Sequence, residues 1–376
     1  MTRLLLVSDI FPPDIGGPAT FIPALGSALV HLGHAITVVC RTPRASPADD
    51  AGWPFPVRRR PGTGMAAGLR LMATLAQEAA RHSVIFTNGL ERQVELVCRA
   101  LGRPYVLKVV GDLAWERMRL NGLTRQSIDE FQLAPPASLP GRAWVQRRLS
   151  FARHARRVIV PSRYLRQLVI GWGVAPERVV VIRNGVEAPA APGLTPRRRT
   201  EARLDALYVG RLVNWKGLET TLRAVAGTAA VHLTIVGQGP EAAGLQALAA
   251  TLGLAERVVF RGGLSRAATQ AALRAADVLV LCSEYEGLSH TLLEAGAAGL
   301  PCLTSERGGN PEVIESGRNG LIVPYGDVDA LRAGLQRLQA DEPERLRLAE
   351  GALAASRAFD FAQTVAQTAA LLTEPA

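Results

Sequence analysis

The feature that most constrains the fold is a regular alternation of short apolar runs with segments of helical periodicity. In the first half, strand-length apolar runs occur at Arg3–Ser8, Ala35–Cys40, Ser83–Thr87, Tyr105–Val110, Arg157–Val160 and Val179–Ile182. The second half repeats the pattern at Ala206–Val209, Val231–Val236, Val258–Arg261, Val278–Leu281 and Leu321–Val323. Because helices alternate with the strands throughout, the sequence predicts an α/β protein with two parallel-sheet domains and right-handed crossovers.

A stretch rich in Pro, Ala and Arg separates the two halves. It reads Ala-Pro-Ala-Ala-Pro-Gly-Leu-Thr-Pro-Arg-Arg-Arg from residue 188, a composition typical of an interdomain linker. We therefore predict an N-terminal domain over 1–187, a linker over 188–203 and a second domain over 204–357. A last helix is expected within 358–376.

Composition limits the classes of protein that the chain can belong to. Hydrophobic residues make up 48% of the sequence, which excludes global disorder. No apolar run reaches the ~18 residues that a membrane helix requires, and no export signal is visible. Four widely spaced cysteines without metal-ligand spacing are interpreted as reduced core residues. These features predict a cytoplasmic protein, either free or at the inner face of the membrane.

The net charge of +10 is distributed unevenly. The first 190 residues carry 25 Lys and Arg against 13 Asp and Glu, and no acid occurs between Glu130 and Glu177. Such a basic domain fits an anionic membrane surface or a phosphorylated acceptor, although a solvated basic helix explains it equally well. Aromatic residues are few and no recognition motif occurs, so nucleic acid is not an expected partner.

One stretch in the second half, residues 282–301, combines two acids with a helix start. Ser289 is a plausible N-cap of a helix over Thr291–Ala298, which places Glu286 just before the helix and Glu294 within it. Eight mostly helical residues would separate the two carboxylates by ~12 Å along the axis. The free N–H groups of Ser289–Leu292 would face an anion between them. This layout predicts a ligand with a hydroxylated ring at each end and a diphosphate in the middle, such as a nucleoside diphosphate sugar.

Three further segments contain candidate site residues, because each segment follows a predicted strand. Arg211 and Lys216 follow the first strand of the second half, where they either bind phosphate or are surface bases at a turn. Gly16-Gly17 follows the first strand of the chain and is either a ligand-binding turn or an ordinary one. Asp112 is either a site residue, because ligands bind at the carboxyl ends of strands, or the cap of the next helix.

Together these motifs resemble glycosyltransferase family 4, the glycosyl transferases group 1. The resemblance rests on Arg211 and Lys216, the Glu286–Glu294 pair and Gly308-Gly309-Asn310-Pro311-Glu312, with weaker support from Pro161-Ser162-Arg163-Tyr164, Asn184-Gly185-Val186 and Gly16-Gly17. It covers nearly the whole chain. It implies a retaining enzyme of GT-B architecture, with two Rossmann-like domains facing each other across a cleft and a last helix that returns to the first domain.

The resemblance also implies roles for individual residues. Arg211 and Lys216 would hold the donor diphosphate, Glu294 the ribose hydroxyls and Glu286 the donor sugar. Backbone at Leu288, Ser289, Thr291 and Leu292, and at Gly16 and Gly17, would contact the donor, and the first domain would hold the acceptor. Many members carry a His after the strand that matches Tyr105–Val110, where this chain has Val110-Gly111-Asp112, so we nominate Asp112 beside Glu286 as catalytic. No Asp-x-Asp motif occurs, and no metal or other cofactor is expected.

The predicted function is transfer of a sugar from a UDP- or GDP-sugar to the hydroxyl of an acceptor sugar, glycolipid or phosphorylated acceptor. The expected setting is cell-envelope, polysaccharide or glycolipid synthesis. Two alternatives remain open. A sugar-nucleotide 2-epimerase would use the same donor site, and a non-catalytic protein would bind the nucleotide sugar without turnover.

Overall fold

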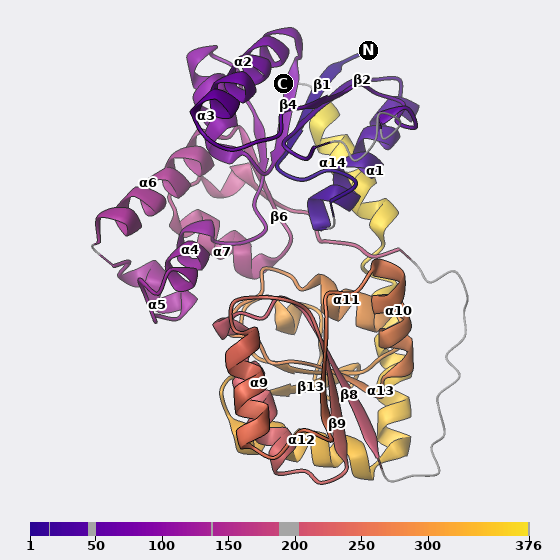
Figure 1. Cartoon of the computed structure of the whole chain (residues 1–376). Coiled ribbons are helices and arrows are strands. Elements are labelled where there is room, and N and C mark those ends of the chain that lie inside the picture. The colour runs from indigo at the N-terminus through magenta and orange to yellow at the C-terminus, as the bar shows by residue number, and fades with distance from the viewer. Residues whose placement is uncertain (15, 44–49, 137, 188–202, 375–376) are drawn as a thin grey trace. The chain divides into compact units, whose positions relative to one another are not determined.

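The computed structural model describes the chain except for residues 15, 44–49, 137, 188–202 and 375–376. The chain divides into two compact units, shown in Figure 1. Unit 1 consists of Met1–Arg183 and Ala362–Ala376, and unit 2 of Asn184–Phe361. The expected linker over 188–203 lies outside the described residues, apart from Arg203.

Unit 1 is built on a seven-stranded parallel sheet with the order β3-β2-β1-β4-β5-β6-β7. All six strands predicted for this half are present. The strands are β1 (Arg3–Ser8), β2 (Ala35–Cys40), β3 (Val57–Arg59), β4 (Val84–Asn88), β5 (Val106–Lys108), β6 (Arg157–Val160) and β7 (Val179–Val181). The strand that sequence analysis missed is β3, because its Val-Arg-Arg sequence carries no apolar run.

Helices cover both faces of this sheet. They are α1 (Gly17–His31), α2 (Met65–Arg81), α3 (Glu91–Ala100), α4 (Leu113–Leu120), α5 (Ile128–Leu133), α6 (Leu139–His154), α7 (Arg163–Gly171) and α14 (Phe361–Thr373). Leu5 and Val7 of β1 share one apolar cluster with residues of α2, α3, α6 and α7. Side chains alternate along a strand, so Leu4 and Leu6 point to the opposite face, where α1 packs against β1 and β2.

Helix α5 was not predicted, although its start carries a recognisable signal. Ser127 Oγ accepts a hydrogen bond from the Glu130 backbone N–H at 3.2 Å, and Glu130 Oε2 accepts one from the Ser127 N–H at 2.8 Å. This reciprocal pair is a capping box, which satisfies two of the N–H groups that a helix start leaves free. A Ser-x-x-Glu pattern could therefore have identified this short helix.

Unit 2 is built on a six-stranded parallel sheet with the order β10-β9-β8-β11-β12-β13. Its strands are β8 (Leu204–Val209), β9 (Val231–Val236), β10 (Val258–Gly262), β11 (Val278–Leu281), β12 (Cys302–Ser305) and β13 (Gly320–Val323). Its helices are α8 (Leu218–Ala226), α9 (Ala242–Thr251), α10 (Arg266–Ala275), α11 (His290–Ala297), α12 (Val328–Ala340) and α13 (Glu342–Ser356). Strand β12 and helix α13 were not predicted. Two parallel-sheet α/β domains, the predicted fold class, are thus confirmed.

The strand order of unit 2 places a ligand site at one point of the sheet. From β8 the chain moves outward through β9 and β10, and then returns to the other side of β8 with β11, β12 and β13. The order therefore reverses between β8 and β11, and ligands of open parallel sheets bind beyond the carboxyl ends of strands at such a switch point. In this unit the loops that leave these two strands are 210–217 and 282–289.

The four cysteines are free and buried, as predicted. Burial raises the pKa of Cys40 and Cys98 to about 11 and that of Cys282 to about 12, so these thiols stay protonated at neutral pH.

Among the described helices, none combines the length and apolar character needed to cross a bilayer.

Candidate functional site

Three loops meet at the switch point of unit 2: loop 210–217 after β8, loop 282–289 after β11 and loop 306–312 after β12. The first two are joined where the Glu284 N–H donates to the Trp215 carbonyl at 2.7 Å. The second and third are joined where the Gly309 N–H donates to the Glu286 carbonyl at 2.8 Å. Residues from three distant parts of the sequence thus form one backbone framework, and loop 282–289 lies in its middle.

Glycines allow these loops to approach so closely. Gly217 has a φ of +71°, and a Cβ built there would lie 2.0 Å from the Cys282 carbonyl oxygen. At Gly309, an added Cβ would lie 2.4 Å from the Gly287 carbonyl oxygen. Real Cβ atoms do not come so near to backbone oxygen, so these contacts between loops require glycine.

We expect Gly217→Ala to destabilise unit 2 by at least about 2 kcal/mol, because it adds a clash to the ~1 kcal/mol cost of a left-handed conformation. Gly253→Ala is the matched control, since Gly253 has a φ of +68° and nothing lies within 4 Å of an added Cβ. Urea titration followed by circular dichroism measures both variants. Equal losses would show that the contact with Cys282 contributes nothing.

The framework brings Lys216 and Glu286 into direct contact. Lys216 Nζ donates to Glu286 Oε1 at 2.5 Å, and Ser283 Oγ donates to the same oxygen at 2.9 Å. The side chains of Lys216 and Glu286 are only 17% and 11% exposed, which strengthens their interaction relative to a pair in open water. An anion that bound here would compete with Glu286 for the ammonium group of Lys216.

Helix α11 starts directly after this pair. Ser289 caps it by accepting a hydrogen bond from the Leu292 N–H at 3.4 Å, which confirms the predicted cap. Ser289 and Leu292 are buried, and Thr291 is half-buried. The remaining N–H groups of the first turn and the positive end of the helix dipole favour a negative ligand at this position.

Glu294 lies in the second turn of α11 and is half-buried. Burial raises the pKa of its carboxyl group, and the nearby Arg266 guanidinium partly offsets this rise. Arg266 begins α10 and also pairs with Glu187 at 2.8 Å. A half-buried carboxylate gains most from ligands that donate hydrogen bonds, such as the hydroxyl groups of a sugar ring.

Arg211 lies on the same edge of the sheet and is exposed. Its carbonyl accepts a hydrogen bond from the Tyr208 hydroxyl at 2.9 Å. Burial raises the pKa of Tyr208, and the Glu286 carboxylate adds to this rise, so Tyr208 lies near both residues. The structure therefore groups Arg211, Lys216 and Glu286 at the edge from which α11 begins.

A network of buried polar side chains holds the Glu286 carboxylate through hydrogen bonds. Asn310 Nδ2 donates to Ser305 Oγ at 3.1 Å, and Ser305 Oγ donates to the Ser283 carbonyl. Ser283 in turn holds Glu286 through its own hydroxyl. Asn310 is fully buried. The network fixes the position of loop 282–289, and it connects the Asn of Gly-Gly-Asn-Pro-Glu with a carboxylate that this Asn does not contact.

The candidate residues of the first half lie in unit 1. Gly16 caps α1, which starts at the exposed Gly17, after the carboxyl end of β1. Their predicted contact with the donor stays a prediction. The carboxyl ends of β1 and β4 form the switch point of this unit, because its strand order reverses between them.

Asp112 follows β5 and is fully buried, and both of its carboxylate oxygens are engaged. Oδ1 accepts from the N–H groups of Ala114 and Trp115, which caps α4. Oδ2 accepts from Gln132 Nε2 at 2.9 Å and pairs with Arg148. These contacts favour the helix-cap alternative, and the catalytic assignment of Asp112 stays a prediction.

The basic run between Glu130 and Glu177 is not a uniformly solvated face. Arg148 is buried against Asp112, and its guanidinium carbon lies 4.6 Å from the centre of the Trp172 ring. Three others donate to backbone carbonyls: Arg153 to Trp172, Arg157 to Glu177, and Arg166 to Pro176. Four of these arginines therefore hold unit 1 together, which weakens the case for an anionic partner at this run.

Two family models match the chain, one in each half. The model described as Glycosyltransferase Family 4 matches residues 15–188, and the one described as Glycosyl transferases group 1 matches residues 197–354. The chain belongs to these glycosyltransferases. The resemblance drawn from its motifs is confirmed, and the protein is a transferase of the GT-B type.

Relatives of this glycosyltransferase act in different pathways. It is 30% identical over 208 residues to the lipopolysaccharide core biosynthesis glycosyltransferase LpsE of Rhizobium meliloti, a match that spans 54% of this chain and 59% of that protein. It is 29% identical to a GDP-mannose-dependent phosphatidylinositol monomannoside mannosyltransferase of Mycobacterium tuberculosis, over 91% of this chain and 90% of the relative. The structure of Anabaena HepE in complex with UDP-glucose is similar to this chain with a TM-score of 0.77 and 21% sequence identity. The match covers 99% of this chain and 100% of the HepE chain.

Two residues at the site of this glycosyltransferase were not predicted: Ser283, which donates a hydrogen bond to Glu286, and Arg266, which affects the pKa of Glu294. The spacing of Ser283 is a usable sequence signal, since a hydroxyl three residues before an acid in a turn commonly contacts it. Arg266 carries none, because it is distant in sequence and only the packing of α10 near α11 brings it to Glu294.

Proposed function

We propose that this glycosyltransferase takes its sugar from a nucleoside diphosphate sugar and transfers it to an acceptor hydroxyl with retention of configuration. The observation that carries the proposal is the Lys216–Glu286 pair, 2.5 Å apart, next to the N-terminus of α11. A cation and a helix start suit a diphosphate, and the carboxylates on either side of that helix start suit hydroxylated rings.

Two relatives bear on the identity of the donor. The mycobacterial mannosyltransferase is named as dependent on GDP-mannose, and the HepE structures contain UDP or UDP-glucose. We therefore propose UDP or GDP as the nucleotide, with Glu294 at the ribose hydroxyls and Glu286 at the donor sugar. Arg211, Lys216 and the backbone N–H groups of Leu288–Leu292 would hold the diphosphate.

The chemistry follows from the charges at this site. The bond between the anomeric carbon and the diphosphate oxygen breaks, and negative charge develops on the leaving group. Lys216 leaves Glu286 and, together with Arg211 and the α11 N-terminus, stabilises that charge. Stabilisation of this kind commonly contributes more to catalysis than any other single effect. The acceptor oxygen bonds to the anomeric carbon on the same face, and its proton passes to a phosphate oxygen. The products are the glycoside and the nucleoside diphosphate, and no covalent enzyme intermediate forms.

We assign the acceptor, a sugar, glycolipid or phosphorylated molecule, to unit 1, which carries the excess positive charge.

Lys216 and Arg211 supply the cationic charge that a metal provides in other transferases, so the proposal includes no metal. Transfer in excess EDTA at the same rate as in buffer would support this point. The proposed setting is the cytoplasm, with products destined for the cell envelope or a polysaccharide.

Variants of the two glutamates test the proposed roles separately. Glu294→Ala should weaken binding of UDP or GDP about 10- to 100-fold, because it removes charged hydrogen bonds to ribose. Glu286→Ala should leave that affinity unchanged or slightly higher, because Lys216 is released, while kcat falls about 100-fold. Titration calorimetry and an initial-rate assay measure these effects, with the exposed Glu315→Ala as control. Equal loss of nucleotide affinity in both variants would contradict the assignment.

The product distinguishes transfer from the two alternative functions. Incubation with donor and candidate acceptors should yield a nucleoside diphosphate and a glycosylated product in equal amounts. An epimerase would instead convert the nucleotide sugar without releasing a glycoside. A binding protein would retain the nucleotide sugar and release neither product.

A further inference from the structure

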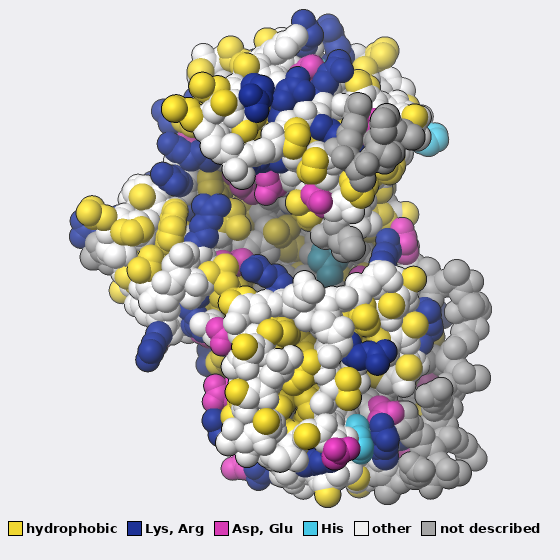
Figure 2. Space-filling view, in the orientation of Figure 1, with side chains coloured by type: hydrophobic (Ala, Val, Ile, Leu, Met, Phe, Trp, Pro, Cys, Tyr) yellow, Lys and Arg dark blue, Asp and Glu magenta, His cyan; other side chains and the backbone are white. Residues whose placement is uncertain are grey.

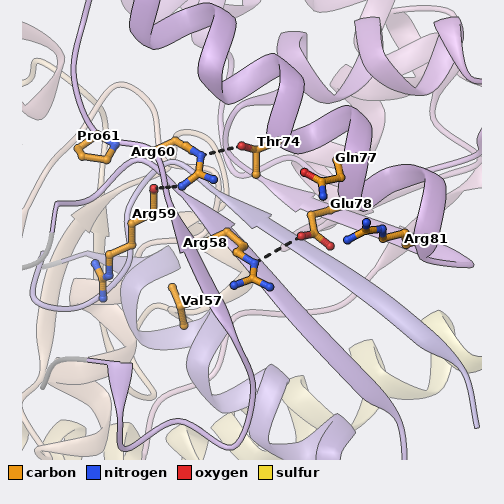
Figure 3. A pocket seen from close by; sticks show the side chains of 9 residues that line it. All are labelled: Val57, Arg58, Arg59, Arg60, Pro61, Thr74, Gln77, Glu78 and Arg81. Atoms are coloured by element: carbon orange, nitrogen blue, oxygen red, sulfur yellow. Dashed lines mark hydrogen bonds and ion pairs between the residues drawn. The ribbon is translucent and has the colours of Figure 1, made fainter. Parts of the chain in front are cut away.

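A second basic feature lies on unit 1, at the edge of its sheet rather than at the switch point between β1 and β4. A hollow of about 660 Å³ opens between the edge strand β3 and helix α2, as Figure 3 shows. We call it the arginine pocket. Dark blue side chains gather over the part of unit 1 that carries α2 (Figure 2). Neither the family resemblance nor the proposed function assigns a role to this pocket.

The alternation of side chains along β3 builds one wall of the arginine pocket. Arg58 and Arg60 point to the same side, toward α2, and Arg59 points to the other. Arg59 is buried and binds Asp50 at 2.9 Å, so its charge is neutralised outside the pocket. Two of the three guanidinium groups in the Val-Arg-Arg-Arg sequence, those of Arg58 and Arg60, therefore lie in the pocket.

Helix α2 supplies the opposite wall through residues about one turn apart. Thr74, Gln77, Glu78 and Arg81 line the pocket from this helix. Among the described residues of the lining, Glu78 is the only acid, and it is buried, lying 3.4 Å from Arg58 Nε. The pocket thus contains three guanidinium groups, of Arg58, Arg60 and Arg81, and one carboxylate, which leaves an excess of two positive charges.

Neutral groups hold the cations in place. Arg60 Nε donates to Thr74 Oγ1 at 2.6 Å, and Arg60 Nη1 donates to the Arg59 carbonyl at 2.8 Å. Arg81 is exposed and lies against the side-chain amide of Gln77. These contacts orient the guanidinium groups without neutralising them. An adjoining hollow of about 450 Å³ shares Arg60 and Thr74 and adds Arg70, which extends the positive lining.

An oriented guanidinium group with unneutralised charge is suited to bidentate binding of a tetrahedral oxyanion. Holding Arg60 in advance also lowers the ordering cost of binding. We propose that the arginine pocket binds a phosphate group, carried either by a soluble phosphorylated molecule or by a lipid headgroup. The pocket shares no residue with the proposed donor site, and it lies at the edge strand β3 rather than at the switch point between β1 and β4.

The test compares two double variants that lose the same charge. Arg60→Gln/Arg81→Gln removes cations from the pocket, and Arg142→Gln/Arg147→Gln removes two exposed arginines from α6 as the control. Both are made in a Lys216→Ala background, which weakens binding of the probe at the donor site. The probe is inorganic pyrophosphate at low ionic strength, followed by calorimetry. The pocket variant should lose about tenfold or more in affinity, and the control should lose little.

Equal loss in the two double variants, or no loss in the pocket variant, would overturn the proposal, because binding would then reflect net charge alone or would lie elsewhere. If removal of Arg60 prevents folding, Arg81→Gln alone serves, because Arg81 is exposed and its guanidinium group lies against the side-chain amide of Gln77. Co-sedimentation with phosphatidylcholine vesicles containing phosphatidic acid identifies the source of the phosphate. Parallel loss of vesicle binding indicates a lipid headgroup, and unchanged vesicle binding indicates a soluble ligand.

In the protein that keeps Lys216, the pocket variant should retain donor-dependent transfer to a small acceptor. This separates the two proposals, since loss of pyrophosphate binding at the pocket leaves the donor assignment intact. Failure of the donor assignment, in turn, would not alter the calorimetric difference between the two double variants.

Discussion

Replacing Lys216 by alanine is expected to lower kcat for sugar transfer by about 10²- to 10³-fold. Lys216 is held at the edge of unit 2 beside the N-terminus of α11, where charge would develop on the leaving diphosphate. Removal of one preorganised charge at such a position typically costs this much in rate. The fold should tolerate the change, because Glu286 keeps its hydrogen bond from Ser283.

Initial rates with a saturating donor measure this effect, and a thermal-shift screen of nucleotide sugars identifies that donor. Arg223→Ala is the matched control, since Arg223 is an exposed cation of the same unit that pairs with Glu219 on α8. It should retain full activity. A Lys216→Ala enzyme with more than a third of the normal kcat would remove this residue from the mechanism.

The second large effect is expected at Asp112, on the stability of unit 1. Asp112→Ala should lower the free energy of unfolding by about 3–5 kcal/mol, because it leaves the buried Arg148 without its carboxylate partner. Loss of the α4 cap adds about 1 kcal/mol. Thermal unfolding of the variant should therefore occur about 10 °C or more below that of the normal protein.

A double-mutant cycle shows whether Asp112 acts through Arg148. Arg148→Met should also destabilise the protein, because it leaves the Asp112 carboxylate unpaired, whereas the double variant Asp112→Ala/Arg148→Met should lose less than the two single variants combined. Asp112→Asn keeps the cap and serves as the activity control. If Asp112→Asn unfolds normally but transfers sugar 100-fold more slowly, Asp112 is catalytic, as we nominated where the chain departs from the family's His, and the structural role is secondary.

Structural elements that depend on a local sequence pattern were predicted correctly. Continuous apolar runs predicted eleven strands, all of which are present, because strands buried on both faces have little choice of residue type. Strand β3 was not predicted, because an edge strand of three residues needs no apolar run. The Ser289 cap was predictable, since it depends only on residues within one turn.

Contacts between distant residues could not be predicted in the same way. Sequence analysis assigned Lys216 and Glu286 to one site but to different parts of the donor, and it did not show that the two side chains pair with each other. The partner of Asp112 lies on α6, and no pattern connects it with the end of β5. The basic run was interpreted either as a face for an anionic partner or as a solvated helix, because the sequence does not distinguish arginines that bind backbone carbonyls from those that do not.

The central claim is that unit 2 holds a nucleoside diphosphate between Glu286 and Glu294. A crystal structure of the protein with UDP or GDP tests it most directly. We predict the diphosphate at the backbone N–H groups of Leu288–Leu292 and beside Lys216, with the ribose hydroxyls within hydrogen-bond distance of the Glu294 carboxylate. A nucleotide bound away from α11, or one whose ribose contacts neither carboxylate, would contradict the account.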